Sequence, residues 1–303
     1  MSVCVLGSIN MDIVLSVSRL PRPGETVSGA TLAHFPGGKG SNQAIAAARL
    51  GADVAILGAV GDDEYGTVLA DALDAAGVDT TALSRLDGET SGQAFVCVSA
   101  KGENFIVVVP GASRALGPDS VSGAGLAGHG VFLAQLEVPV ETVQAFFSAP
   151  PARQGTRILN AAPAATAALP LLALADILVV NETELALFAG AGEPPSDATV
   201  IERLSRRLIT TGGQTVIVTL GARGALAVTA GETVAVSGHA VPVVDTTGAG
   251  DCFCGALAAM LDSGAVLPAA LEFANAAAAI AVTRKGAAPS MPGFVEVEAL
   301  LAG

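Results

Sequence analysis

The sequence has no tryptophan, only one tyrosine, three lysines and four cysteines, and no two cysteines form a C-x-x-C pair. Its three histidines, His34, His129 and His239, lie far apart along the chain. Structural zinc sites and disulfide frameworks need closely spaced cysteines or histidines, so the sequence argues against both. No apolar run reaches about 18 residues without a break, which argues against a membrane-spanning helix.

Positive charge is the scarcer sign, with 15 lysines and arginines against 28 acidic residues and a formal net charge of −13. Broad binding to nucleic acid or to an anionic membrane needs basic patches, so we expect neither partner. A phosphorylated small molecule remains compatible with this charge, because backbone N–H groups can form a local anion site. No basic segment precedes an apolar stretch and cleavage site at the N-terminus, so we expect a cytoplasmic protein.

Short apolar runs alternate with helical patterns along the 303 residues, as in residues 2–9, 54–60, 131–136 and 176–180. Runs without apolar–polar alternation are typical of strands buried on both faces of a parallel sheet. No linker or internal repeat interrupts the pattern. We therefore predict an α/β fold with a mostly parallel central sheet, formed by one domain over residues 1–303.

A hairpin is predicted from residues 93–99 and 105–109, joined by residues 100–104. The second strand, FIVVV, is apolar on both faces, whereas a hairpin with one solvated face should alternate. We therefore expect both faces to be covered, one by the protein body or a ligand and the other by a partner subunit.

The segment Asp245-Thr246-Thr247-Gly248-Ala249-Gly250-Asp251 is the most informative in the chain. Residues 243–244 are expected to close a strand, and a helix should follow the glycine turn. A helix start offers free N–H groups to an anion, and glycines let a phosphate come close. Asp251 adds a carboxylate that could act as a base beside this anion hole. The alternative interpretation is an aspartate that only caps the helix.

Two other strand ends carry polar residues. Asn10 and Asp12 follow the first apolar run and share one face if the chain stays extended, which suits hydrogen bonds to neighbouring hydroxyls; an Asx turn is the alternative. Gly37-Gly38-Lys39-Gly40-Ser41-Asn42-Gln43 opens an alanine-rich helix. It fails the Walker A pattern, because residue 33 is Ala and Lys39 is followed by Gly40.

Two further motifs have simpler interpretations. Gly123-x-Gly125-x-x-Gly128 matches the dinucleotide fingerprint but precedes a strand and opens no helix, so we reject it as a nucleotide site. Asn181 and Glu184 have the spacing of a capping box, which is compatible with a nearby ligand site.

Taken together, these strand ends resemble the ribokinase family of carbohydrate kinases over essentially the whole chain. Gly37–Gly40 and Asp245–Asp251 are similar to the two signature regions of that family, and Ser8-Ile9-Asn10-Met11-Asp12, Asn181-Glu182-Thr183-Glu184 and the AAAAIAVTRK segment at residues 276–285 support the match. The resemblance implies a three-layer ribokinase-like fold and a small β-sheet lid from segments near 12–36 and 89–110, paired between two subunits of a homodimer.

The resemblance also implies a reaction, in which ATP phosphorylates D-ribose at O5 to give D-ribose 5-phosphate. Asp251 would be the general base, and Gly248, Ala249 and Gly250 the anion hole. The implied sugar contacts are Asn10, Asp12, Gly38, Lys39, Asn42, Glu137 and Asp251. The implied ATP contacts are Asn181, Thr219, Gly221, Gly250 and Asn275.

Two metal ions are implied as well. Mg²⁺ would sit mainly on ATP phosphates and water, with Asn181 and Glu184 nearby. A monovalent cation such as K⁺ would bind at Asp245, Thr247, Ala281, Arg284, Gly286 and Ser290. This chain departs from the family pattern at Ser41, which replaces a frequent alanine, and at Asn275, which replaces a histidine of some members.

Three hypotheses stay open, and phosphorylation of ribose is the first. The acceptor could be deoxyribose, a ketohexose or a nucleoside, although Asp12 and Glu137 suggest a dense hydroxyl network that an acceptor lacking a hydroxyl would leave unsatisfied. A nucleoside would also need an aromatic stacking platform, and the chain has only ten phenylalanines and one tyrosine. A non-catalytic sugar-binding module on the same fold is the third alternative.

Overall fold

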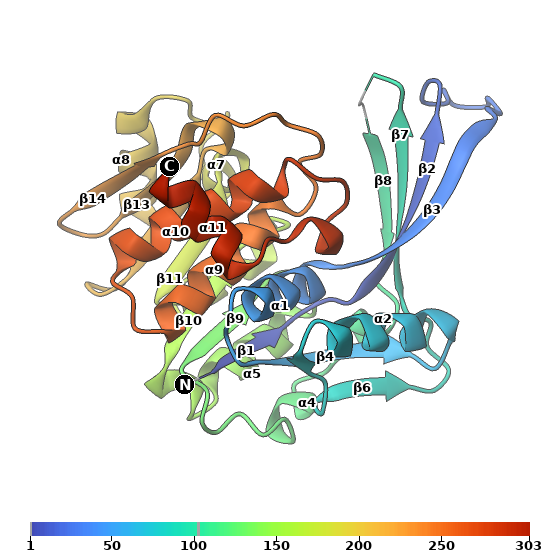
Figure 1. Cartoon of the computed structure of the whole chain (residues 1–303). Helices are drawn as coiled ribbons and strands as arrows, with labels where there is room; N and C mark the ends of the chain where they lie inside the picture. Colours follow the sequence, from blue (N-terminus) through green and yellow to red (C-terminus); the bar gives the residue numbers. More distant parts are fainter. Residues whose placement is uncertain (1, 102–103) are drawn as a thin grey trace.

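The computed structural model describes residues 2–101 and 104–303 (Figure 1). Residue 1 and residues 102 and 103, in the predicted connection 100–104, lie outside the described residues. Ten strands of the described chain form the main sheet, in the order β14-β13-β12-β11-β10-β9-β1-β4-β5, with β6 also paired to β4. Their bounds are β1 Val3–Leu6, β4 Val54–Gly61, β5 Val78–Asp79, β6 Leu83–Leu86, β9 Val131–Ala134, β10 Thr156–Asn160, β11 Ile177–Asn181, β12 Thr215–Thr219, β13 Gly224–Val228 and β14 Thr233–Ser237.

The main sheet is parallel from β12 through β5, and only β13 and β14 add antiparallel pairs at one edge. Residues of its central strands alternate between two hydrophobic cores. Val3 and Val5 belong to one core, whereas Cys4 and Leu6 belong to the other. Both faces are therefore dry, as expected of a parallel sheet between helical layers. The predicted three-layer fold is confirmed.

The helices divide between these two faces. The first core contains residues of α1 Lys39–Arg49, α2 Glu64–Ala75, α9 Ala249–Asp262, α10 Leu267–Ala281 and α11 Phe294–Ala302. The second contains residues of α3 Ala112–Ala115, α4 Asp119–Ser122, α5 Val140–Ser148, α6 Leu169–Leu172, α7 Glu182–Phe188 and α8 Ala198–Leu208. Among the described residues, no helix is both long and apolar enough to span a bilayer.

The second sheet has the order β3-β2-β7-β8 and stands away from the main body in Figure 1. Its strands are β2 Asn10–Val17, β3 Gly29–Gly37, β7 Gly92–Ser99 and β8 Asn104–Val109. Strands β7 and β8 form the predicted antiparallel hairpin, whereas β2 and β7 pair in parallel. Strand β2 follows β1 after three residues, so the two sheets meet where Asn10 and Asp12 lie.

The expected burial of strand β8 is not found within this chain. Phe105 is 63% exposed and Val109 is 43% exposed, and the residues between them fall within this range. Because β8 is the edge strand of its sheet, its outer backbone groups also face away from the described chain.

Several predicted boundaries are wrong. The first apolar run, residues 2–9, contains β1 and the three connecting residues 7–9, and β2 begins at Asn10, so Asn10 is strand and the Asx-turn alternative fails. The long helix predicted at residues 268–284 ends at Ala281, with the following residues in a loop.

The strand expected at residues 243–244 is absent from the described chain. Main-sheet pairing ends at Ser237 of β14, and Val243 and Val244 are exposed in an irregular segment. The backbone N–H groups of Val244 and Asp245 both donate to the carbonyl of Val282 after α10. This segment is therefore fixed to a helix end, because no neighbouring strand is left to pair with it.

Candidate functional site

The site lies at the carboxyl ends of the parallel strands, where helices α1 and α9 both begin. Helix α1 starts directly after Gly38, which has φ 88°, and a Cβ there would lie 2.7 Å from the backbone nitrogen of Asn10. Only glycine combines this backbone conformation with so close a contact. The glycine loop thereby brings Lys39 and Asn42 against the junction of the two sheets.

Asp251 is the third residue of α9 and is only 6% exposed. The helix cap is Gly248, with φ 76°. The carboxylate of Asp251 instead accepts two side-chain hydrogen bonds from α1, from Asn42 Nδ2 to Oδ2 at 2.9 Å and from Gln43 Nε2 to Oδ1 at 3.0 Å. The capping interpretation of Asp251 is therefore wrong, because its oxygens are turned to another helix.

The first turn of α9 forms the wall next to this carboxylate. Gly248, Gly250 and Asp251 line a cavity of about 130 Å³ together with Lys39 and Thr219. The first N–H groups of a helix lack partners within the helix and carry the positive end of its dipole. This cavity therefore pairs an anion-attracting helix end with a carboxylate.

Acidic and polar side chains surround Lys39 on the side of the second sheet. Glu137 Oε2 accepts hydrogen bonds from the hydroxyl of Ser8 and from the backbone N–H of Lys39. The pKa of Lys39 is raised, mainly by the charge of Asp251 against the opposing effect of burial. Burial, followed by the charges of Glu137 and Asp251, raises the pKa of Asp12 to about 7.

Two amide oxygens here lack hydrogen-bond partners in the described chain, Oδ1 of Asn10 and Oδ1 of Asn42. Both residues are buried, and a buried polar atom without a partner costs free energy. Asn10 and Glu137 also line an open cavity of about 610 Å³, which Val108 of β8 borders. The predicted residues Asn10, Asp12, Gly38, Lys39, Asn42 and Glu137 are thus brought to the junction of the two sheets.

A third cavity, of about 520 Å³, lies between the β13–β14 edge, α9 and α10. Its lining is mostly apolar and includes the predicted Thr219, Gly221, Gly250 and Asn275. Asn275 Nδ2 donates to the carbonyl of Ser237 at 2.8 Å, which fixes the side chain against the strand edge. Thr219 and Gly250 also line the 130 Å³ cavity, so the two spaces adjoin near Asp251.

Asn181 and Glu184 form the predicted capping box at the start of α7. Asn181 Oδ1 accepts from Glu184 N at 2.9 Å, and Glu184 Oε2 accepts from Asn181 N at 2.7 Å. Both residues also line the 130 Å³ cavity. Burial raises the pKa of Glu184, partly opposed by the hydrogen bond from Asn181 and by Lys39.

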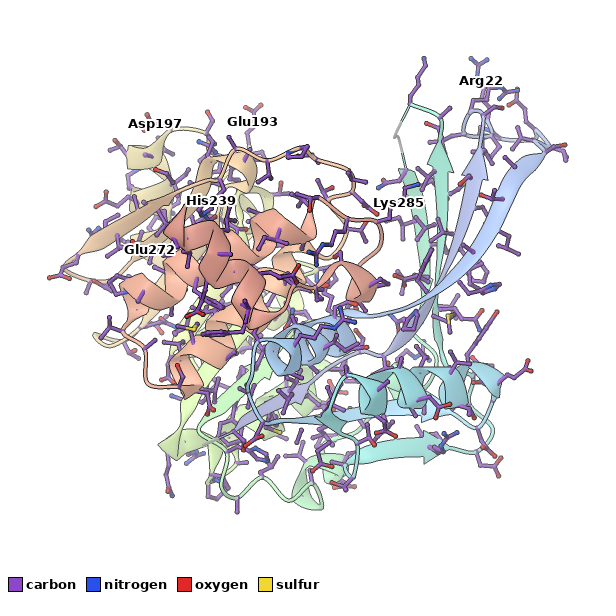
Figure 2. All side chains as sticks on the ribbon, in the orientation of Figure 1. Arg22, Glu193, Asp197, His239, Glu272 and Lys285 are labelled. Atoms are coloured by element: carbon purple, nitrogen blue, oxygen red, sulfur yellow. The ribbon has the colours of Figure 1, made fainter. Side chains whose placement is uncertain are left out.

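The residues predicted to bind a monovalent cation gather in two adjoining segments. Asp245 Oδ1 accepts from the N–H and hydroxyl of Thr247, and Oδ2 accepts from Gly286 N at 2.9 Å. Burial would raise the pKa of Asp245, but these hydrogen bonds outweigh it and lower the pKa. Ala281 ends α10 and Ser290 is buried in a short 3₁₀ turn, whereas the Arg284 side chain turns away to Glu296. Figure 2 shows Lys285 on the same loop.

Three residues of the site were not predicted: Ser8, Gln43 and Asn160. Gln43 contacts Asp251, Asn160 lines the 130 Å³ cavity, and Ser8 binds Glu137. A sequence signal existed for each, since Gln43 follows Asn42 in the glycine loop and the other two end apolar runs. Fold and site together place a buried carboxylate, a helix N-terminus and two adjoining cavities at one edge of an α/β sheet.

Comparisons with known proteins identify the family of the chain. A family model described as pfkB family carbohydrate kinase matches residues 1–293. A ribokinase of Haemophilus influenzae is 38% identical over 290 residues, which cover 95% of this chain and 94% of that protein. A deoxyribokinase of Salmonella typhi is 34% identical over 297 residues, which cover 97% and 96% of the two chains.

Solved structures agree with this result. A ribokinase of Thermotoga maritima superposes with a TM-score of 0.91 at 34% identity and covers 100% of both chains. An Arabidopsis thaliana ribokinase complexed with ribose and ATP superposes with a TM-score of 0.87 at 34% identity, covering 100% of this chain and 99% of that one. The chain belongs to the pfkB family of carbohydrate kinases, as its motifs predicted.

The raised pKa of Asp12 predicts a pH-dependent loss of stability in the ligand-free protein. A raised pKa means that the folded protein binds this proton more tightly than the unfolded chain. Its stabilising contribution is therefore complete below the ordinary pKa and is lost as pH rises through about 7. Asp12→Asn should gain at least ~1 kcal/mol relative to the parent protein between pH 5 and pH 8. Urea unfolding at both pH values measures this, with Asp71→Asn on the exposed face of α2 as control; a pH-independent difference contradicts it.

Proposed function

We propose that this chain transfers the γ-phosphoryl group of ATP to O5 of D-ribose and releases D-ribose 5-phosphate and ADP. The observation that carries the proposal is the Asp251 carboxylate, held by Asn42 and Gln43 in the wall of a cavity that a helix N-terminus also lines. The O5 proton passes to Asp251, O5 forms a bond to the γ-phosphorus, and the bond from that phosphorus to the ADP oxygen breaks. N–H groups of Gly248, Ala249 and Gly250 stabilise the charge on the transferred group.

The sugar would bind at the junction of the two sheets. The partnerless Oδ1 atoms of Asn10 and Asn42 need hydrogen-bond donors, and sugar hydroxyls supply them. Asp12 and Glu137 add carboxylate acceptors, and Lys39 balances their charge. Gly38 holds the start of α1 close enough to Asn10 for these groups to converge.

The choice of acceptor rests on this dense set of polar groups. The similarity to a deoxyribokinase keeps deoxyribose as the second candidate. An acceptor without one hydroxyl would leave a buried acceptor unsatisfied, so the polar groups favour ribose. A ketohexose or a nucleoside has less support, and a sugar-binding module without activity would need no base beside the anion hole.

ATP would occupy the 520 Å³ cavity with its phosphates directed to the 130 Å³ cavity that Asp251 lines. Thr219, Gly221 and Asn275 line the first space, and Asn181 the second. Mg²⁺ fits beside Glu184, whose second carboxylate oxygen lies outside the capping box, with phosphates and water as its other ligands. ATP as the phosphoryl donor supports a cytoplasmic location.

A monovalent cation fits the paired segments that Asp245 holds together. The hydrogen bond from Gly286 N to Asp245 joins the loop before α9 to the loop after α10. Backbone carbonyls of Thr247, Ala281, Arg284 and Gly286, together with Ser290, would supply oxygen ligands. Such an ion would stabilise the loop that leads into Gly248, and hence the anion hole.

The second sheet would act as a lid over the sugar and as the contact between two subunits. Val108 of β8 already borders the cavity next to Asn10 and Glu137. The exposed apolar residues of this edge strand would pack against the same sheet of a second copy. This arrangement supplies the cover that the apolar pattern of residues 105–109 predicts.

Loss of the base tests the mechanism. Asp251→Asn keeps the shape of the side chain but removes its ability to take a proton, so kcat should fall at least ~10²-fold while sugar and ATP still bind. A coupled ADP-release assay and calorimetric titration measure the two effects. Turnover near that of the parent protein would refute the role of Asp251.

A sugar panel with and without K⁺ tests the substrate and the cation together. At fixed ionic strength, ribose should give the highest kcat/KM, ahead of deoxyribose, fructose and adenosine. Replacing K⁺ by tetramethylammonium, which is too large for a site made of carbonyl oxygens, should lower kcat for every acceptor. Another acceptor ahead of ribose overturns the substrate assignment, and equal rates in both salts overturn the cation site.

A charge in β8 tests the subunit contact. Ile106→Asp should shift the protein from dimer to monomer in sedimentation equilibrium, because a buried unpaired carboxylate is costly. Val295→Asp on α11 is the matched control, since Val295 is 75% exposed and far from β8 in the chain. A parent protein that is already monomeric at micromolar concentration contradicts the proposed dimer.

A further inference from the structure

Gln43 lies behind the carboxylate of Asp251 and is completely buried. Its Nε2 donates two hydrogen bonds, to Asp251 Oδ1 at 3.0 Å and to Asn160 Oδ1 at 3.1 Å. Its Oε1 accepts a bond from Nε2 of Gln135 at 2.7 Å. Gln43 lines neither the 130 Å³ cavity nor the 520 Å³ cavity, so it reaches the site only through other side chains.

These contacts permit only one orientation of the Gln43 amide. A primary amide has two N–H donors and one carbonyl oxygen, and both donors of Gln43 are used. The reversed orientation would place Oε1 against Oδ1 of Asp251 and Oδ1 of Asn160, which are both acceptors. It would also direct N–H groups at the N–H groups of Gln135. The network therefore has a fixed direction, from Gln135 through Gln43 to Asp251.

The outer members of the network are themselves fixed by the main sheet. Gln135 follows β9, and Asn160 ends β10. In the main sheet β10 pairs with β9, and β9 pairs with β1. A Cβ on Gly7 would lie only 2.0 Å from Oε1 of Gln135. Gln135 is therefore packed against the backbone that follows β1. Asn160 is buried, and its Nδ2 is directed at the carbonyl of Val179 on β11.

These hydrogen bonds restrict the orientation of the Asp251 carboxylate. Asn42 holds Oδ2 of Asp251, and Gln43 holds Oδ1, so rotation of the carboxylate would break both bonds. Both donors are neutral amides, which favour the charged carboxylate without competing for its proton. Asn42 carries a partnerless oxygen and has a proposed sugar contact, whereas Gln43 has all its polar atoms occupied.

We propose that Gln43 is a positioning residue for phosphoryl transfer: it fixes the rotation of the Asp251 carboxylate and keeps it ready to accept a proton, and Gln135 and Asn160 fix the Gln43 amide. This inference rests on the proposed role of Asp251 as the base. It assigns a role in the reaction to Gln43, which lines neither of the cavities proposed for ATP and acts through other side chains.

Gln43→Met tests the inference with a side chain of similar length and no hydrogen-bonding group. We expect kcat to fall ~10- to 100-fold, with KM for ribose and the affinity for ADP within ~3-fold of the parent values. The acid limb of the log(kcat/KM) profile should move to higher pH, because the charged carboxylate has lost a donor. A role in folding alone would lower thermal stability and leave this limb in place.

Gln43→Glu gives a second, distinct signature. When protonated it retains one donor toward Asp251, but when ionised it faces Asp251 with a like charge. Its kcat/KM should therefore fall as pH rises through the range in which the parent rate is level. Gln135→Leu should shift kcat in the same direction as Gln43→Met but by a smaller factor.

Ser41→Ala is the matched control. Ser41 lies in the same helix and is equally buried, and its hydroxyl has no partner in the described chain, so kcat and the pH profile should stay unchanged. If Asp251→Asn is inactive while Gln43→Met keeps its kcat and its acid limb, the positioning role is refuted and the base assignment stands. If Asp251→Asn turns over normally, the proposed mechanism itself is refuted. If Gln43→Met does not fold, the Gln135→Leu and Gln43→Glu profiles decide, and unchanged kcat in both refutes the inference.

Discussion

The site depends on one buried contact, the carboxylate of Asp251 held between two amides of helix α1. A buried carboxylate is costly unless hydrogen bonds replace its water, and Asn42 and Gln43 supply them. This contact requires α1 and α9 to lie close together. Gly255 permits the approach, because a Cβ there would lie 2.5 Å from the carbonyl of Gln43. The close packing of α1 against α9 is therefore also what holds the Asp251 carboxylate in place.

The charges around this contact explain why the site suits a sugar and a nucleotide together. Asp12, Glu137, Glu184 and Asp251 are acidic, and Lys39 lies among them. Without ligands, burial and mutual repulsion raise the pKa of Asp12 and Glu184. Sugar hydroxyls can donate to the acidic groups, and the helix end of α9 attracts phosphate oxygens. The strongly acidic chain can therefore bind an anion, because the positive potential comes from backbone dipoles and one lysine.

The second sheet differs physically from the main body. The main sheet is covered on both faces by helices, whereas the edge strand β8 leaves apolar residues exposed. The main sheet thus has its stabilising contacts within the chain, whereas the apolar side chains of β8 are not buried by the described chain. The two sheets meet at Asn10, so any partner or ligand that covers the second sheet lies next to the proposed sugar contacts.

The sequence by itself determined the elements with strong local signals and the family. Continuous apolar runs identified the parallel strands, glycine turns identified the starts of α1 and α9, and the spacing of Asn181 and Glu184 identified a capping box. These features are set by residues adjacent in the chain, so pattern and spacing are sufficient. The sequence also pointed to Asp251, but it left open whether that residue is a base or a helix cap.

The tertiary structure decided what depends on distant neighbours. It turned Asp251 away from its own helix end, because amides more than 200 residues earlier hold the carboxylate. It placed residues 243–244 in a loop, because the edge of the sheet had already been reached at β14. It brought Gln43, Gln135 and Asn160 into one network, which no spacing along the chain could reveal, since hydrogen-bond partners across a sheet are set by strand order and packing.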